Sequence, residues 1–167
     1  MIKVHPANYQ TIEKYKDNQW LEVFPESEDT LKHHYFEFYS EDKPIGCWRL
    51  RHKDGITNHG NNFVYYEHRG KGWGNKILLI SMNVIKEIFP DTKIFYVQCI
   101  FTNKRNLHIR DKQFGIENRY LETAEPNRFG FMEKCEKDYI YYDSFENVWN
   151  RNKKDIEELG KVKYESA

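Results

Sequence analysis

The sequence predicts a single α/β (α+β) fold: a mixed, mostly antiparallel twisted sheet with a central parallel βαβ crossover and flanking helices. A chain of 167 residues fits one domain with one hydrophobic core. Residues 34–40 and 44–52 alternate in strand fashion around a turn signal at 41–44, which predicts an antiparallel hairpin. Residues 63–101 then read as strand, glycine loop, helix and strand, which is the size of a βαβ unit with a parallel strand pair.

The segments before this crossover are shorter. Residues 1–5 predict a strand, and residues 8–24 predict one or two small helices that end at a turn around Pro25. The polar stretch 53–62 contains two glycines, so it predicts a turn or a bulge. The next strand is expected at 63–66.

The helix of the crossover is expected over residues 75–89, where two neighbouring apolar stripes follow the helical period. Ile77, Ile80 and Val84 belong to one of these stripes. Such a wide apolar face suits a helix that lies across a sheet. The following run, residues 94–101, is almost continuously apolar, which is typical of an interior strand covered on both sides.

The remaining elements are expected in the last third of the chain. Residues 104–113 predict a shorter helix, and residues 119–124 and 129–142 predict two strands that complete the mixed sheet. We therefore expect one domain over residues 1–145. Residues 146–167 are charged and are expected to form an appended helix or a frayed tail.

The composition narrows the choice of partners. The chain has 26 Lys and Arg against 26 Asp and Glu, so its net charge gives no broad indication of a polyanionic partner. Cys47, Cys99 and Cys135 form no CxxC pair, which predicts reduced thiols and neither a disulfide framework nor a metal site. Neither a signal peptide nor a membrane-spanning apolar run is present, so we expect a cytoplasmic protein without membrane association.

The stretch RGKGWGN, residues 69–75, is the strongest functional signal, and we call it the glycine loop. Successive backbone N–H groups at the start of a helix converge on an anion, and glycine lets a phosphate approach them closely. Lys71 and Lys76 add positive charge there. The loop has neither the Walker A spacing nor the GxGxxG of a dinucleotide fold. Either it holds a pyrophosphate, or it is a tight turn that binds nothing.

The residues YYEHRGKGWGNKILLISMNVIKE, at 65–87, resemble the acyl-CoA-binding motif of the GCN5-related N-acetyltransferases, whose pattern is [QR]-x-x-G-x-[GA]. The order of the expected elements is also similar to that family. The resemblance covers roughly residues 1–142 and is strongest at 62–106. It implies an N-acetyltransferase that uses acetyl-CoA as cosubstrate, needs no metal, and transfers the acetyl group directly to an amine acceptor.

The resemblance also implies where acetyl-CoA binds. The amides of residues 71–75 would hold the pyrophosphate, and the strand at Val64 and Tyr65 would pair with the pantetheine arm. In the family this strand splays from the next one, and the thioester lies between the two. The cofactor-binding residues implied are Val64, Tyr65, Arg69, Gly70, Lys71, Gly72, Trp73, Gly74, Asn75 and Asn103.

The sequence departs from the family where the leaving thiolate is protonated. The family usually has a tyrosine seven residues after the asparagine that corresponds to Asn103, whereas this chain has Arg110 or Asp111, depending on the alignment. Another acid would then serve, His108 or solvent, or the activity is altered or lost. His108 and Glu67 are the candidates for proton transfer. The alternative for both is an ordinary surface position.

A local basic cluster follows the crossover and consists of Lys104, Arg105, His108, Arg110 and Lys112. It is a solvated helix face, a contact for the 3′-phosphate of coenzyme A, or a contact for nucleic acid. Two alternatives to the acetyltransferase therefore stay open. One is a protein of the same fold that binds nucleic acid or the transcription machinery without acyl transfer, and the other is an enzyme that modifies nucleic-acid bases. A homodimer through the terminal strands is also compatible with the sequence.

Overall fold

The computed structural model describes residues 1–8, 10, 31–135 and 137–166. The helices expected over 8–24 and the turn at Pro25 fall outside the described residues, apart from Asn8 and Gln10. The strands are β1 (Ile2–Ala7), β2 (His34–Ser40), β3 (Lys43–Lys53), β4 (Ile56–Val64), β5 (Ile94–Ile100), β6 (Arg119–Glu122), β7 (Asp138–Ser144) and β8 (Val162–Tyr164). The α-helices are α2 (Ile77–Ile88), α3 (Lys104–Phe114), α4 (Phe145–Arg151) and α5 (Lys153–Leu159), with short 3-10 turns η3 (Tyr66–His68), η4 (Trp73–Asn75) and η5 (Ile116–Asn118).

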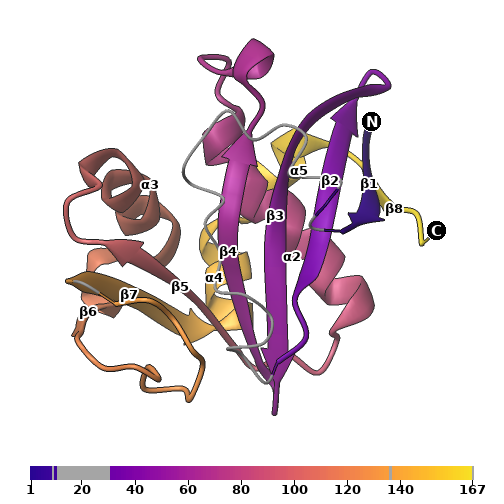
Figure 1. Cartoon of the computed structure of the whole chain (residues 1–167). Helices are drawn as coiled ribbons and strands as arrows, with labels where there is room; N and C mark the ends of the chain where they lie inside the picture. The colour runs from indigo at the N-terminus through magenta and orange to yellow at the C-terminus, as the bar shows by residue number, and fades with distance from the viewer. Residues whose placement is uncertain (9, 11–30, 136, 167) are drawn as a thin grey trace.

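The described strands form an eight-stranded sheet in the order β6-β7-β5-β4-β3-β2-β1-β8 (Figure 1). The pairs β4–β5 and β1–β8 are parallel, and the other pairs are antiparallel. Helix α2 connects β4 to β5 and supplies the parallel crossover. The predicted fold class, including the hairpin of β2 and β3 and the interior strand β5, is therefore confirmed.

The main core lies between one face of this sheet and the helices. Trp48 and Leu50 of β3 and Phe95 of β5 pack there against α2, α3 and α4. In Figure 1, α2, α4 and α5 lie behind the sheet. Alternate residues of the same strands point to the opposite face, as strand geometry requires. That opposite face carries a second set of buried side chains, many of them polar.

The polar stretch 53–62 was expected to precede a strand, but most of it belongs to β4. The predicted turn is there, at Asp54 and Gly55, and a bulge follows where the register with β3 shifts between Cys47 and Arg49. Polar side chains are tolerated in this interior strand because they find buried partners. Asn58, for example, accepts hydrogen bonds from two arginines of β3.

The end of the chain also differs from the expected pattern. The strand expected over 129–142 begins only at Asp138, because Asn127 Oδ1 accepts from the Phe129 and Phe131 amides and fixes a loop there. The charged C-terminal segment forms α4, α5 and β8. Strand β8 pairs with β1, so this segment completes the sheet edge. Among the described residues, no helix is both long and apolar enough to cross a membrane.

Candidate functional site

Strands β4 and β5 pair over only three residues and then diverge. The parallel register runs from Ile56 with Ile94 to Asn58 with Tyr96, while β4 stays paired with β3 up to Val64 (Figure 1). We call the region between the two strands beyond Asn58 the splay. The glycine loop follows the end of β4, and α3 begins just after β5, so both border the splay. Its position agrees with the thioester site that the family resemblance implies.

The glycine loop presents a row of backbone donors. Gly72 has φ +84°, a left-handed conformation that favours glycine. Within the part of the chain that the structure describes, no backbone N–H from Gly70 to Asn75 donates to a carbonyl outside the η4 turn itself. Helix α2 starts immediately after η4 and has no side chain that caps its N-terminus. The free N–H groups therefore lie at the positive end of a helix dipole, where an anion is stabilised.

Gly74 is the most informative residue of the loop. It lies in the η4 turn without a positive φ, and a Cβ built on it would meet no heavy atom within 4 Å. The described chain therefore gives no steric or conformational reason for a glycine at this position. A ligand that approaches the backbone gives such a reason.

Aromatic and cationic side chains fix the loop to the sheet. The Trp73 ring packs 5.7 Å from the Phe38 ring in the main core, and Lys76 Nζ lies 4.9 Å from the centre of the Trp73 ring. Arg69 turns back and donates from Nε to the Val64 carbonyl oxygen at 3.0 Å. Tyr65 N–H donates to Ile45 O of β3, so it is not available to a pantetheine arm. The loop is thus held from both sides while its own amides stay free.

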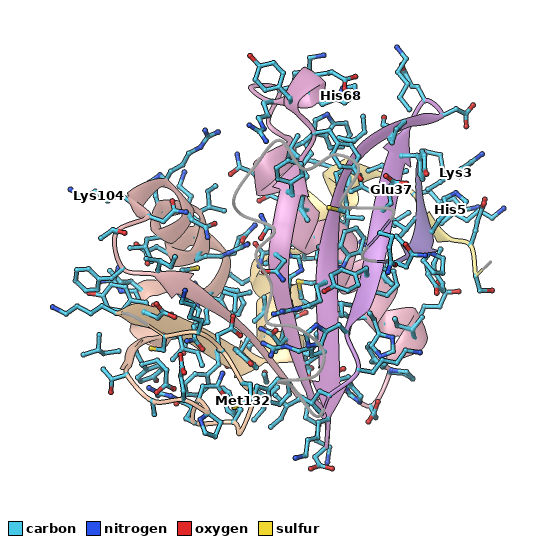
Figure 2. All side chains as sticks on the ribbon, viewed as in Figure 1. Lys3, His5, Glu37, His68, Lys104 and Met132 are labelled. Carbon is cyan, nitrogen blue, oxygen red and sulfur yellow. The ribbon has the colours of Figure 1, made fainter. Side chains whose placement is uncertain are left out.

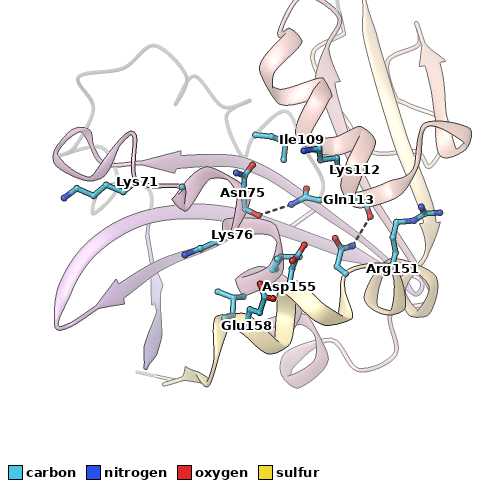
Figure 3. Close-up of a pocket in the computed structure, with 13 residues that line it drawn as sticks. Lys71, Asn75, Lys76, Ile109, Lys112, Gln113, Arg151, Asp155 and Glu158 are labelled. Carbon is cyan, nitrogen blue, oxygen red and sulfur yellow. Dashed lines mark hydrogen bonds between the residues drawn. The ribbon is translucent and has the colours of Figure 1, made fainter.

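A cavity of about 620 Å³ opens beside the glycine loop, between the loop, α3, and the helices α4 and α5 (Figure 3). Its cationic lining side chains are Lys71, Lys76, Lys112 and Arg151, and its acidic ones are Asp155 and Glu158. Gln113 of α3 donates from Nε2 to the Asn75 carbonyl oxygen at 3.1 Å and joins α3 to the loop. The sequence analysis did not identify Arg151, Asp155 and Glu158, because no local motif marks them.

The structure decides between Arg110 and Asp111. The Arg110 side chain points into the splay and donates from Nη2 to Asn62 Oδ1 of β4 at 2.9 Å. Asp111 turns away from the splay, where it accepts from the Tyr141 hydroxyl at 2.6 Å and pairs with Arg119 at 3.2 Å. Arg110 therefore occupies the position that borders the splay, and the bulge in β4 presents Asn62 to it.

The other residues expected from the sequence lie further out. Asn103 is the N-cap of α3, and its Oδ1 accepts from the Asn106 amide at 3.2 Å. Glu67 lies on the exposed η3 turn, and His108 lies on the exposed face of α3. Among the described residues, no side-chain contact of either one brings it against the splay. Their roles in proton transfer stay predictions.

The basic cluster is not one face of α3. Arg110 is only 2% exposed, whereas Lys104 and Arg105 are exposed, and Lys104 points outward at the edge of the molecule (Figure 2). The expectation that Arg110 joins the others in a surface contact with nucleic acid is wrong, because the helical period turns Arg110 toward the core with Leu107. Lys112 faces the cavity beside the glycine loop.

A second polar cluster, which the sequence analysis missed, lies on the face of the sheet opposite α2. Glu37 of β2 is 4% exposed, and its two carboxylate oxygens accept from the Tyr39 and Tyr65 hydroxyls at 2.5 Å each (Figure 2). Burial raises the pKa of the neighbouring Cys47 thiol to about 12. The alternation of Glu37 with Tyr35 and Tyr39 in one strand could have indicated a polar cluster on that face of the sheet. The contact with Tyr65 had no local signal, because the two residues are 28 positions apart.

No protein-family model and no curated protein sequence matches the chain. Solved structures do match. A variant of a spermidine N-acetyltransferase from Vibrio cholerae superposes with a TM-score of 0.64 at 12% identity, covering 90% of this chain and 98% of that one. The chain has the GCN5-related N-acetyltransferase fold.

Two further structures share this fold. An Escherichia coli N-acetyltransferase for the alanine of a ribosomal protein has a TM-score of 0.58 at 12% identity, covering 87% of this chain and 94% of that one. A Bacillus subtilis acetyltransferase in complex with CoA has a TM-score of 0.53 at 10% identity, covering 86% of this chain and 99% of that one. At these identities, the similarity establishes the GCN5-related fold and leaves the chemistry to be argued from the site.

Among the described residues, no group of three or more His, Cys, Asp and Glu side chains is arranged to hold a metal ion.

Proposed function

We propose that this protein is an N-acetyltransferase that transfers an acetyl group directly from acetyl-CoA to an amine. The observation that carries the proposal is the row of free backbone N–H groups around Gly74, at the N-terminus of α2 and next to the splay. A pyrophosphate fits such a row, since it is a dianion that accepts several backbone hydrogen bonds at once. The complex of the similar Bacillus subtilis protein with CoA supports the same ligand class.

The cavity beside the loop suits the remaining phosphate of coenzyme A. Lys71 belongs to the loop and Lys76 directly follows it. Lys112 lies on α3, and Arg151 of α4 is already paired with Glu117 at 2.7 Å. A phosphate monoester bound there would be stabilised by charge-assisted hydrogen bonds. Asp155 and Glu158 would repel the same group, so we place the phosphate on the side of Lys71 and Lys112.

The pantetheine arm would then run from the loop into the splay and bring the thioester beside β4. Holding the thioester and the amine together accounts for much of the rate gain that such an enzyme needs. A backbone N–H of β4 that faces the splay would donate to the thioester oxygen as charge develops on it. The amine must lose a proton during the attack.

The acceptor would approach from the face of the sheet opposite α2. Glu37 provides a buried carboxylate there, surrounded by Tyr35, Tyr39 and Tyr65, and aromatic rings with a carboxylate favour a cationic amine. The amine proton would pass through the Tyr65 hydroxyl to Glu37. Glu37→Gln is expected to lower the rate of transfer and to leave acetyl-CoA binding unchanged.

Titration calorimetry tests the proposal directly. Acetyl-CoA is expected to bind at micromolar Kd, and ATP and NAD are expected to bind far more weakly, because neither carries the pantetheine arm. Gly72→Glu is expected to abolish acetyl-CoA binding, since a carboxylate would enter the row of free amides. Equal affinity of the wild type and this variant would show that the glycine loop is not the pyrophosphate site.

The Arg110–Asn62 hydrogen bond gives specific support to a second function. Because it crosses the splay, it could keep the thioester out, and the protein would then bind coenzyme A without transferring the acyl group. An amine panel that includes polyamines and peptide N-termini separates the two functions. Release of free CoA thiol with any amine establishes transfer. Binding of acetyl-CoA without release under all conditions establishes the binding protein.

A further inference from the structure

Arg110 is a buried cation whose partners are all neutral. Arg110 is 2% exposed, and its guanidinium donates to Gln113 Oε1 at 2.8 Å and to Asn62 Oδ1 at 2.9 Å. Its Nε has no hydrogen-bond partner. In the described parts of the chain, no carboxylate forms an ion pair with it. Arginine keeps its charge even when burial lowers its pKa, so the positive charge in the splay has no compensating negative charge among the described residues.

The titratable groups that face Arg110 cannot supply the missing negative charge. Among the described residues they are Cys99 of β5, Tyr141 of β7 and His59 of β4. Burial raises the pKa of the Cys99 thiol to about 11 and also raises the pKa of Tyr141, so both are neutral near pH 7. Burial together with the charge of Arg110 lowers the pKa of His59 well below its usual value, so this imidazole is neutral too.

An uncompensated buried charge is costly, and such charges in proteins are usually paired. On β4, the Asn61 Nδ2 atom is also buried without a hydrogen-bond partner among the described residues, and Asn61 has a φ of +50° in the bulge. Two nitrogens without a hydrogen-bond partner among the described residues, Arg110 Nε and Asn61 Nδ2, therefore lie on the two elements that border the splay, α3 and β4. This arrangement suits an anion that is present during only part of a working cycle.

We propose that Arg110 is a catalytic residue that holds the sulfur of the departing coenzyme A as a thiolate in the splay. The inference rests on the proposed acetyl transfer. The amine nitrogen forms a bond to the thioester carbon, the carbon–sulfur bond breaks, and its electron pair stays on sulfur beside the guanidinium. The amine releases its proton to the acceptor-side base or to water. The thiolate takes up a proton from water when coenzyme A leaves.

A fixed cation stabilises the leaving thiolate electrostatically, whereas a general acid protonates it. A proton donor must be protonated at each turnover, whereas arginine stabilises the thiolate at every pH at which the protein is folded. The position of Arg110 is also tied to the pyrophosphate site, because Gln113 bonds both Arg110 and the Asn75 carbonyl of the glycine loop. Binding at the loop and orientation of the guanidinium are therefore mechanically linked.

The first test uses coenzyme A itself as the probe. The ultraviolet absorbance of a thiolate is measured for CoA bound to the wild type, to Arg110→Lys and to Arg110→Gln, across a pH series. Desulfo-CoA serves as the blank. Wild-type protein is expected to show bound thiolate at neutral pH, whereas a free thiol titrates near pH 8.5. Arg110→Lys is expected to keep part of this signal and Arg110→Gln to lose it.

The second test is kinetic. Arg110→Gln is expected to lower kcat about 100-fold, comparable to the removal of one transition-state donor, with acetyl-CoA affinity changed less than about threefold. Lys93→Gln removes one positive charge from the exposed residue before β5 and is the matched control, with kcat expected to equal that of the wild type. If Arg110→Gln does not fold, the thiolate spectra of the wild type and Arg110→Lys decide.

The outcomes are distinct. A protonated thiol on the wild type at neutral pH overturns the inference, even if Arg110→Gln is slow, because the arginine would then be structural. Acetyl transfer by the wild type with an equally active Arg110→Gln overturns the inference and leaves the proposed function intact. Absence of acetyl-CoA binding to the wild type overturns both.

Discussion

Replacing Gly74 with alanine separates the needs of folding from those of ligand binding. Gly74 has no positive φ, and its Cβ position is open, so alanine fits the η4 turn as it stands. Alanine restricts the unfolded chain, which stabilises a protein by about 0.4–1 kcal/mol at a compatible site. For a domain of this size that raises Tm by about 1–4 °C. Gly74→Ala is therefore expected to be slightly more stable than the wild type.

The same methyl group would stand where the pyrophosphate approaches the backbone. Losing one or two hydrogen bonds to a charged phosphate costs about 1.5–3 kcal/mol. The Kd for acetyl-CoA is then expected to rise by about 10- to 100-fold, since every 1.4 kcal/mol is tenfold. Thermal unfolding without ligand and titration calorimetry with acetyl-CoA measure the two effects on the same preparation.

Two further alanine variants complete the comparison. Gly72→Ala forces alanine into φ +84° and Gly130→Ala into φ +80°, at a cost of about 1–2 kcal/mol in each case. Both are expected to lower Tm, but only Gly72→Ala should also weaken acetyl-CoA binding, because Gly130 lies in the loop before β7. If Gly74→Ala binds acetyl-CoA as tightly as the wild type does, a ligand that approaches the backbone is not the reason for glycine at this position.

Three other predictions concern the stability and reactivity of the chain. Asn58→Leu removes the amide oxygen that accepts from two buried arginines of β3. The free energy of unfolding, measured in urea, is therefore expected to fall by about 3 kcal/mol. An unchanged free energy of unfolding would contradict a stabilising role for these hydrogen bonds. Burial alone would raise the pKa of Glu122, but hydrogen bonds from Arg128 and from backbone amides outweigh it and lower the pKa below 4.5. The stabilisation from ionised Glu122 is present above that pH and is lost as the pH falls through the lowered pKa of the folded state. Arg128→Gln should therefore flatten the drop in Tm on the acid side. Superimposable profiles of Tm against pH for the variant and the wild type would exclude this contribution. Because burial raises the pKa of Cys47 to about 12 and of Cys99 to about 11, both should react slowly with a thiol reagent near neutral pH until urea unfolds the chain, as a thiol count over time would show.

Much of the fold was predictable because its strongest elements have local signals. The apolar stripes of 75–89 correspond to α2, and the continuous apolar run of 94–101 corresponds to the interior strand β5. Strand β4 was placed too late because its middle is polar. Its amide, imidazole and hydroxyl groups are acceptable in a sheet only through partners on β3, α2 and the turn before β5. Those partners are not adjacent in sequence.

The candidate site divides in the same way. The glycine loop could be predicted as a phosphate site from the sequence, because its residues are consecutive. The cavity beside it could not, since Arg151, Asp155 and Glu158 come from helices that follow it in the chain by more than 70 positions. The Glu37–Tyr65 contact spans 28 positions and the Arg110–Asn62 contact spans 48, so neither has a local signal.

The sequence by itself determined the class of the fold, the central crossover and the position of the glycine loop before α2. Each of these depends on interactions between near neighbours in the chain, namely helical and strand periodicity and the conformational freedom of glycine. Only the tertiary structure decided which of two adjacent residues borders the splay. Arg110 and Asp111 differ by one position, or about 100° around α3, and the packing of α3 against β5 and β7 sets which of them is buried.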